Sequence, residues 1–303
     1  MANKILITGA SGLIGTRLTE LLQKENPEVA HLVRSVKKSL VQTFLWNPEA
    51  NRIDPQALKN VNTIIHLAGS GIAEKRWSAK RKKEILNSRV LSTRLLADVL
   101  QKENHSVETI VSASAIGYYG PGDDQKIFTE DDSPGSDFLA QVTRQWEQEV
   151  EQFQSLNIRV VKIRIGKVLS TKGGALKEMA RPVRLGLGAP LGSGQQYMSW
   201  IHIDDLCHIF KQALNDKNMQ GIYNGVTDWC TNAELTKALA KILHKPLWLP
   251  SVPSFVLKIA LGEMADLVLK GNKVSSEKIR NEGFVFRYPQ LNDALTELLG
   301  SKQ

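Results

Sequence analysis

The chain has 303 residues, of which 42% are hydrophobic and 23% charged, close to the usage of ordinary globular proteins. This composition excludes disordered, collagen-like and coiled-coil proteins, and the length suits about two domains. Lysine and arginine number 39 against 31 acidic residues, and the net charge of +8 favours anionic partners such as nucleotides and phosphates. No apolar run is long enough for a membrane span. The two cysteines are too few for a disulfide framework, so we expect a cytoplasmic protein with no membrane partner.

Apolar runs alternate with helical periodicity in the first half of the chain. The runs at 5–8, 29–33, 43–46, 63–67, 109–112 and 158–165 predict strands, and apolar residues at helical spacing predict helices at 13–22, 85–100 and 138–153. This alternation predicts an α/β fold with a doubly wound parallel sheet and helices on both faces. The continuous apolar runs fit strands that are buried on both faces.

Basic residues are densest at 75–83, just before the second of these helices. A nucleic-acid site would interleave aromatic residues with the charges, and this segment contains only Trp77. We therefore expect a solvated helix face near a phosphate site, and no nucleic-acid partner.

Glycine and proline become frequent after Gly166, which indicates loops and turns. Helical spacing returns at 204–214, 232–243, 254–269 and 291–299. We predict a first domain over 1–166, with sheet contributions from later segments. A smaller, mostly helical C-terminal lobe over 167–303 would bind substrate.

Three glycines follow the first strand and open the first helix. This spacing permits a tight turn, a close approach of the backbone to a diphosphate and close packing of the helix on the sheet. The free N–H groups of the helix N-terminus then face the diphosphate. The predicted dinucleotide-binding residues are Gly9, Ser11, Gly12, Leu13, Ile14 and Gly15.

Arg34 and Ser35 follow the second strand, where an NAD-binding protein usually carries an acid for the ribose 2′-hydroxyl. A guanidinium matches a 2′-phosphate, which a carboxylate would repel. The sequence therefore predicts NADP(H) as the cofactor, with a surface arginine at a strand end as the alternative.

The ends of the fourth and fifth strands supply further candidates, because ligands bind at the carboxyl ends of strands in open α/β sheets. Leu67 is followed by the small residues Ala68 and Gly69, which would let adenosine and ribose lie against the strand edge. Ser112 and Ser114 share one face of the fifth strand. We expect Ser112 to contact the cofactor and Ser114 to hydrogen-bond a reacting hydroxyl, with capping of the next turn as the alternative.

These motifs resemble the extended short-chain dehydrogenase/reductase superfamily. More narrowly, Arg76-Trp77, Ser88-Arg89-Val90, Gly192-Ser193-Gly194 and the run from Met198 to Asp205 resemble its atypical epimerase family subgroup. That subgroup has a C-terminal helical extension and includes a human member and bacterial proteins described as nucleotide-sugar epimerases. The resemblance covers nearly the whole chain and implies a Rossmann-type fold and bound NADP(H).

Hydride chemistry in that superfamily usually relies on a tyrosine general acid/base and a lysine four residues later that lowers its pKa. None of the five tyrosines has a lysine at that spacing, and Phe138 and Val142 stand, within a residue, where the pair is expected. We expect Tyr118 or Tyr119, near Ser114, to be the substitute catalytic residue. Aromatic packing beside the nicotinamide is the alternative.

The resemblance also implies that Arg164, Gly166 and Lys167 line the junction of cofactor and substrate, and we place Arg164 among the cofactor residues. Gly174, Arg181 and Gln196 are the predicted substrate residues. Arg181 would bind a phosphate or carboxylate, or form a surface salt bridge.

No metal site is predicted, because His202 and His208 are six residues apart, which does not suit one helix face. Cys207 between them is expected to be a buried small residue. The resemblance gives His202 and Asp205 a structural role that ties the lobe to the sheet.

We therefore expect an NADP(H)-binding oxidoreductase or epimerase that acts on a small substrate, a sugar nucleotide or another carbonyl compound. The alternative is a catalytically silent, NADP(H)-bound sensor or interaction protein, because the tyrosine–lysine pair is missing and relatives are linked to cell or plastid division. Relatives dimerise through two long helices, and their counterparts here, around 80–102 and 138–153, imply a homodimer.

Overall fold

The computed structural model describes residues 4–25, 28–36, 40–122 and 125–300. Its main sheet has eight strands in the order β11-β8-β6-β5-β1-β2-β3-β4. They are β1 (Lys4–Thr8), β2 (Glu28–Val33), β3 (Gln42–Asn47), β4 (Arg52–Ile53), β5 (Val61–His66), β6 (Thr109–Ala115), β8 (Arg159–Ile165) and β11 (Gly221–Gly225). Neighbouring strands are parallel except β3 and β4.

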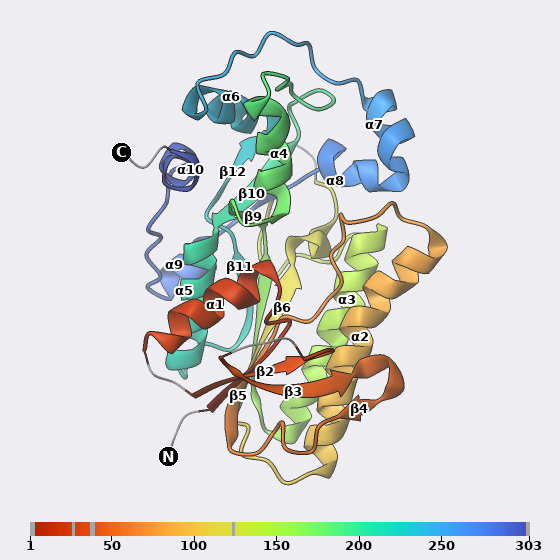
Figure 1. Cartoon of the computed structure of the whole chain (residues 1–303), viewed down its shortest axis with the longest axis vertical. Helices are drawn as coiled ribbons and strands as arrows, with labels where there is room; N and C mark the ends of the chain where they lie inside the picture. Colours follow the sequence, from red (N-terminus) through yellow and green to blue (C-terminus); the bar gives the residue numbers. More distant parts are fainter. Residues whose placement is uncertain (1–3, 26–27, 37–39, 123–124, 301–303) are drawn as a thin grey trace.

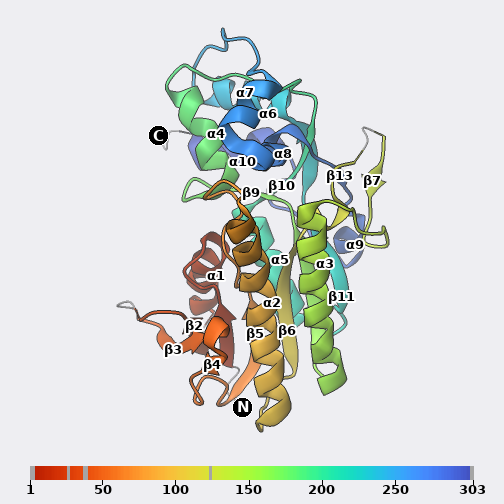
Figure 2. The same cartoon turned by 90° about the vertical axis from the view of Figure 1, so that its right-hand side faces the viewer.

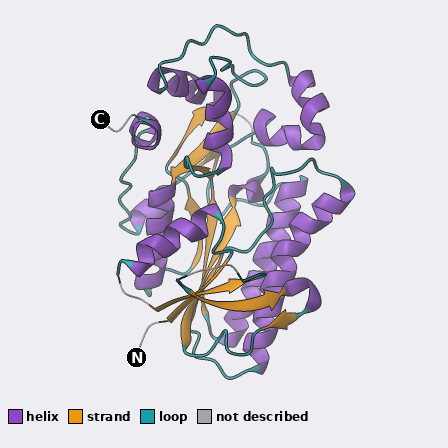
Figure 3. Ribbon diagram, in the orientation of Figure 1, coloured by secondary structure: helices purple, strands orange, loops and turns teal. Residues whose placement is uncertain are grey.

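Helices cover both faces of this sheet, so that it lies between two helical layers (Figure 3). α1 (Leu13–Gln23) and α5 (Ile203–Asn215) lie together on one face, and α2 (Ala79–Lys102) and α3 (Phe138–Glu151) on the other (Figure 1). Figure 2 shows α2 and α3 side by side. All five residues of β1 are buried, as expected for a strand covered on both faces. None of the described helices has the length and apolar character to cross a membrane.

The direction in which the chain builds the sheet reverses at β1. From β1 the chain adds β2 and β3 on one side, then returns to add β5, β6, β8 and β11 on the other. Ligands in such sheets bind outside the carboxyl ends of the strands at this reversal. The register places Thr8 beside His66, so the ends of β1 and β5 meet there. The predicted Rossmann-type, doubly wound parallel sheet is confirmed.

The second half of the chain builds a smaller lobe with its own core. Its three-stranded sheet contains β9 (Lys167–Leu169), β10 (Tyr197–His202) and β12 (Asp228–Thr231), which the sequence did not predict. Around it lie α4 (Gly174–Arg184), α6 (Asn232–Ile242) and α10 (Leu291–Leu299), with Leu176, Trp200 and Leu239 buried between them.

The lobe and the main sheet share chain segments. α5 and β11 follow β9 and β10 in sequence, yet Leu206, Phe210 and Tyr223 are buried in the core of the main sheet. Asp205 accepts hydrogen bonds from the backbone N–H groups of Arg287 at 2.9 Å and Tyr288 at 3.1 Å. The segment before α10 is thereby fixed to α5.

The single helix expected at 254–269 is wrong. The structure has α7 (Ser254–Leu261), the short 3-10 helix η4 (Gly262–Ala265) and α8 (Asp266–Leu269). The break falls at Gly262, whose φ of 62° is in the left-handed region, and a methyl group there would lie 2.9 Å from Nη2 of Arg76. The other elements are η1 (Pro48–Ala50), η2 (Ile116–Tyr119), β7 (Ile127–Phe128), η3 (Gln152–Leu156), β13 (Lys273–Val274) and α9 (Glu277–Asn281).

Candidate functional site

The glycine-rich turn between β1 and α1 presents bare backbone at the edge of the sheet. Gly9 has a φ of 66°, and a methyl group on it would lie 2.5 Å from the carbonyl oxygen of Leu67. At Gly15 a methyl group would lie 2.6 Å from the carbonyl oxygen of Gly9, so α1 packs directly on the turn. Gly12 begins the helix and is exposed, like Ser11. No side chain caps α1, and its first turn carries no acid, so its N–H groups are available to an anion.

The end of β5 is joined to this turn by a buried hydroxyl network. The Thr8 hydroxyl oxygen accepts hydrogen bonds from the backbone N–H groups of Leu67 at 3.1 Å and Ala68 at 3.2 Å. The hydroxyl also lies 2.9 Å from Nδ1 of His66, and Nε2 of His66 lies 3.0 Å from Thr93 Oγ1. Burial lowers the pKa of His66 to about 3, so the ring is neutral. His66 therefore holds the strand ends in place rather than facing a ligand.

Arg34 and Ser35 are both exposed just beyond β2. Among the described residues, the Arg34 side chain takes part in no hydrogen bond or ion pair. The strand register places β2 directly beside β1. Within the described ranges, the guanidinium therefore has no protein partner at the carboxyl edge that it shares with the glycine-rich turn, where a 2′-phosphate would be expected.

Three of the predicted site residues form an interior network with Glu147 and Asn224. Ser114 donates a hydrogen bond to Glu147 Oε1 at 2.5 Å, and Arg164 donates to both carboxylate oxygens of Glu147 at 2.9 Å. Arg164 also donates at 3.0 Å to the hydroxyl of Tyr119, which in turn donates to Asn224 at 2.7 Å. All five side chains are buried.

This network has electrostatic consequences for the proposed catalytic tyrosine. Burial raises the pKa of Tyr119 to about 12, although Arg164 beside it acts in the opposite direction. Burial alone would lower the pKa of Arg164, but the hydrogen bonds and charge of Glu147 raise it. Tyr119 is therefore a neutral, fully hydrogen-bonded group at physiological pH.

The neighbouring candidates are also engaged by the protein. The Ser112 hydroxyl is completely buried and donates to the carbonyl oxygen of Ala113 at 2.9 Å. The ring of Tyr118 is half-buried and stacks under the Arg164 guanidinium, with 3.4 Å from Cζ to the ring centroid. These residues surround the end of β6 without lining the adjacent cavity.

The predicted substrate residues are dispersed. Gly174 begins α4 and lies against Leu13, since a methyl group on it would be 3.3 Å from Leu13 Cδ2. Arg181 is exposed on α4. Gln196 donates hydrogen bonds to the carbonyl oxygens of Leu191 at 2.9 Å and Val268 at 2.7 Å, which fixes its loop to α8. The structure thus brings Gly174 to the glycine-rich turn, and it places none of the three in the cavity described next.

A cavity of about 460 Å³ lies at the carboxyl edge of β6 and β8. The end of β6 with η2, the β8–β9 junction, α2, α3 and residues between 263 and 272 form its walls. Phe138 and Val142, which stand where the tyrosine–lysine pair was expected, both line it. The cavity is large enough for a small organic substrate.

Two cations face this cavity without a carboxylate partner among the described residues. Arg89, from α2, donates to the carbonyl oxygens of Ser70 at 3.2 Å and Ile85 at 2.9 Å, and burial lowers its pKa to about 10. It also lies against Gly69, where a methyl group would be 3.1 Å from its Cζ. Lys167, at the start of β9, has its pKa lowered by burial to about 8. Sequence reasoning did not assign Arg89 to the site. Lys167 was noted only through the resemblance.

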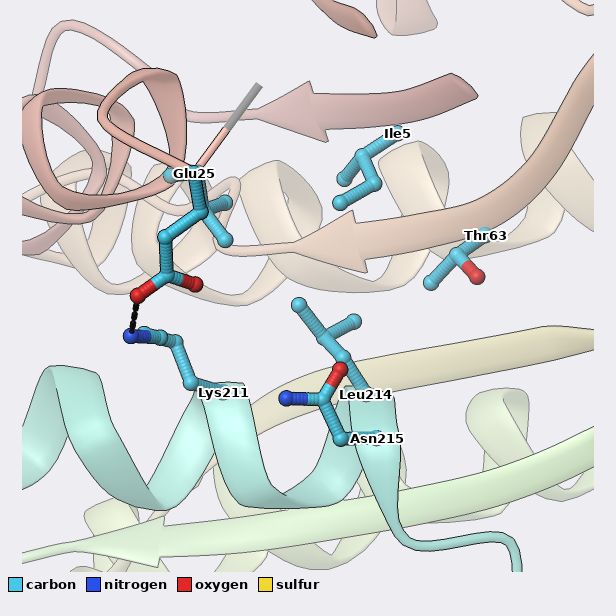
Figure 4. A pocket seen from close by; sticks show the side chains of 7 residues that line it. Ile5, Glu25, Thr63, Lys211, Leu214 and Asn215 are labelled. Carbon is cyan, nitrogen blue, oxygen red and sulfur yellow. Dashed lines mark hydrogen bonds and ion pairs between the residues drawn. The ribbon is translucent and has the colours of Figure 1, made fainter. Parts of the chain in front are cut away.

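A second, smaller cavity of about 140 Å³ lies at the opposite, amino-terminal edge of the sheet (Figure 4). Ile5 and Thr63 bound it near the starts of β1 and β5, and Lys211 pairs with Glu25 across it. Ligands of doubly wound sheets bind at the other edge, so we treat the larger cavity as the candidate active site.

The sheet, the reversal at β1 and the bare glycine turn together define a dinucleotide-binding α/β protein. The chain belongs to the NAD dependent epimerase/dehydratase family, whose model matches residues 5–224. A second family model, a domain of unknown function (DUF1731), matches residues 252–298.

Similar proteins span the full length of the chain. Epimerase family protein Mb2239 of Mycobacterium bovis is 38% identical over 299 residues, 97% of each chain. The chloroplastic SDR39U1 homolog of Arabidopsis thaliana is 37% identical over 97% of this chain and 86% of its own. The crystal structure of human epimerase family protein SDR39U1 (isoform 2) with NADPH superposes with a TM-score of 0.88 at 32% identity, covering 98% of this chain and 99% of that one. The predicted epimerase family subgroup is confirmed.

Proposed function

We propose that this protein binds NADP(H) at the carboxyl edge of the main sheet and transfers hydride to or from a small substrate in the 460 Å³ cavity. The observation that carries the proposal is the uncapped, acid-free start of α1 with the exposed Arg34 beyond the neighbouring strand. A diphosphate fits such a helix start, and a guanidinium fits a 2′-phosphate. NADPH in the similar human structure supports this choice of cofactor.

The position of the cavity supports an enzyme rather than a silent sensor. Arg89 touches both Gly69, at the predicted cofactor edge, and the cavity. A ligand in the cavity would therefore lie next to the cofactor edge. A bound nicotinamide cofactor would supply the hydride, and the chain would orient the substrate and exclude water. Sugar nucleotides and other carbonyl compounds are the proposed substrate classes.

The cofactor proposal can be tested by titrating the protein with NADPH and NADH and following nicotinamide fluorescence. We expect NADPH to bind more tightly than NADH. Gly12→Val should abolish binding and leave the fold intact, because Gly12 has a φ of −77° and its added methyl would approach only the Gly9 carbonyl, at 3.2 Å. Ala260→Val, at an exposed position of α7 away from the glycine-rich turn, is the control. Unchanged NADPH binding by Gly12→Val would contradict the site.

Turnover is tested separately from binding. Purified protein with NADPH is mixed with a panel of sugar nucleotides, ketones and aldehydes, and absorbance of the reduced nicotinamide is followed. Loss of absorbance with at least one compound is expected. An epimerase first oxidises the sugar with NADP⁺ and then returns the hydride, so the sugar nucleotides are also incubated with the protein and NADP⁺ and analysed for the epimer. Tight NADPH binding with no change in any compound would favour the sensor.

We also propose a cytoplasmic homodimer that pairs α2 and α3 of two copies. The buried free thiols of Cys207 and Cys230 suit a reducing compartment. Light scattering should give twice the chain mass of 33.7 kDa, and a monomer mass at micromolar concentration would contradict the dimer.

A further inference from the structure

The candidate active site lacks the tyrosine–lysine pair that transfers protons in the superfamily. The two residues that stand in its place have no ionisable proton. Phe138 and Val142 both line the cavity from α3. Ser114 and Tyr119 already donate their hydroxyl protons in the interior network, to Glu147 and Asn224. Reduction of a carbonyl requires a proton for the oxygen as well as a hydride for the carbon. Another group at the cavity must therefore give that proton.

Most ionisable side chains that line the cavity are engaged by the protein. Lys82 pairs with Glu263, and Lys270 pairs with Asp266 at 2.8 Å. Asp137 caps the N-terminus of α3 by accepting a hydrogen bond from the Ala140 N–H at 2.8 Å. The two ion pairs neutralise their own charges, and Asp137 accepts a backbone hydrogen bond.

Lys167 differs from these groups. Its ammonium takes part in no hydrogen bond or ion pair within the described part of the chain. The backbone around it is fixed, because Lys167 pairs with Trp200 in the small sheet and the preceding Gly166 donates to the Gly225 carbonyl at 3.0 Å. Gly166 is also confined, since a methyl group there would lie 2.9 Å from the Ser199 carbonyl oxygen. Lys167 therefore lines the cavity from a backbone position that the small sheet holds in place.

The surroundings of Lys167 hold its pKa at about 8, mainly through burial. The thiol of Cys230 on β12 interacts electrostatically with Lys167, and the other charged groups that line the same cavity are Arg89 on α2, Asp137 and the two ion pairs at Lys82 and Lys270. A general acid works best when its pKa lies near the working pH. Arg89, with a pKa of about 10 and a guanidinium head, suits anion binding better than proton transfer.

We propose that Lys167 is the catalytic acid–base residue of the cavity, replacing the tyrosine of the superfamily. This inference rests on the proposed function. In the reducing direction, hydride from the reduced nicotinamide forms the new C–H bond. One N–H bond of the Lys167 ammonium breaks, and its proton forms the O–H bond on the substrate oxygen. The neutral amine then regains a proton from water, and the reverse reaction begins with the neutral amine.

The first experiment measures the lysine itself. The protein is reductively methylated with ¹³C-formaldehyde, and the dimethyl-lysine signal that Lys167→Met lacks is titrated by NMR. A midpoint near 8 is expected, against about 10.4 for an ordinary lysine. Lys237→Met, which removes an exposed lysine of α6, identifies an ordinary signal for comparison. A midpoint near 10 for Lys167 would overturn the proposal.

The second experiment measures turnover with the carbonyl compounds that the wild-type protein reduces. Lys167→Met should lower kcat about 10²- to 10⁴-fold while the NADPH dissociation constant and the melting temperature stay unchanged. Lys167→Arg should not restore kcat, because a guanidinium holds its proton too tightly, and Lys237→Met should behave as wild type. Equal kcat in Lys167→Met and wild type would overturn the role of Lys167 and leave the proposed function standing. Absence of wild-type turnover would instead remove the proposed function, and this inference with it.

Discussion

The exposed guanidinium of Arg34 is the determinant of cofactor choice that we propose. Hydrogen bonds to charged groups contribute about 1.5–3 kcal/mol, so Arg34→Asp should weaken NADPH binding about 10- to 100-fold. NADH, which has no 2′-phosphate, should bind at least as well as before. Fluorescence titration of both cofactors measures the change.

Lys217 offers a matched control for Arg34. It is exposed in the turn that precedes β11, at the edge of the sheet away from the glycine-rich turn. Lys217→Asp makes the same charge change and should leave both affinities as they were. If Arg34→Asp still prefers NADPH, the role assigned to Arg34 is incorrect.

His66 should make stability depend on pH. The unfolded chain binds a proton at this residue below about pH 6.5, whereas the folded protein binds it only near pH 3. The free energy of unfolding should therefore fall by about 1.4 kcal/mol per pH unit as the pH decreases from about 6 to 4. Urea titrations at several pH values measure this slope, which His66→Gln should reduce.

The control for this slope is His244→Asn, which replaces an exposed histidine with a residue that tolerates its φ of 51°. It should keep the wild-type slope. Parallel curves for wild type and His66→Gln would show that another group is responsible.

The limits of sequence reasoning are clearest for the site residues. Glycine spacing locates the turn at Gly9 and Gly15 because local backbone geometry requires it. The same reasoning cannot tell whether a polar residue at a strand end faces a cavity or the interior. Ser114 faces inward because Glu147, 33 residues later on α3, accepts its hydrogen bond. The burial that lowers the pKa of Lys167 likewise comes from segments distant in sequence.

At the scale of elements, α7 differs from the other long helices of the lobe because none of its residues is buried. Its Ile259 is 73% exposed, whereas Leu206 of α5 is completely buried. Ile259→Lys should change the free energy of unfolding by no more than about 0.5 kcal/mol, and Leu206→Ala should reduce it by about 2–5 kcal/mol. Chemical denaturation compares the two variants. A loss above 2 kcal/mol for Ile259→Lys would mean that the apolar face of α7 is covered in solution.

Strands were more predictable than the helices of the lobe. The apolar run at 5–8 became β1 (Lys4–Thr8), because a strand buried on both faces needs a continuous apolar segment. Apolar residues at 254–269 keep a helical spacing, yet Gly262 adopts a φ of 62° and ends α7. Glycine also occurs inside helices, so the apolar spacing alone did not place the break.

For the whole molecule, the first 166 residues should not form a stable unit alone. A fragment that ends there lacks β11, which pairs with β8, and α5, which covers one sheet face. The exposed strand edge and apolar face favour association. We expect the fragment to aggregate or to unfold without cooperativity by circular dichroism, in contrast to the full chain. Cooperative unfolding of a monomeric fragment would contradict this.

The cavity draws one wall from a single continuous stretch, between residues 263 and 272, whereas the residues that we assign to the cofactor lie before residue 70, apart from Ser112 and Arg164. Under the proposed function, changes in this one short piece of chain would alter the choice of substrate while the cofactor stays the same. Transplanting that piece between two homologues would exchange their preferences among ligands and leave nicotinamide affinity untouched.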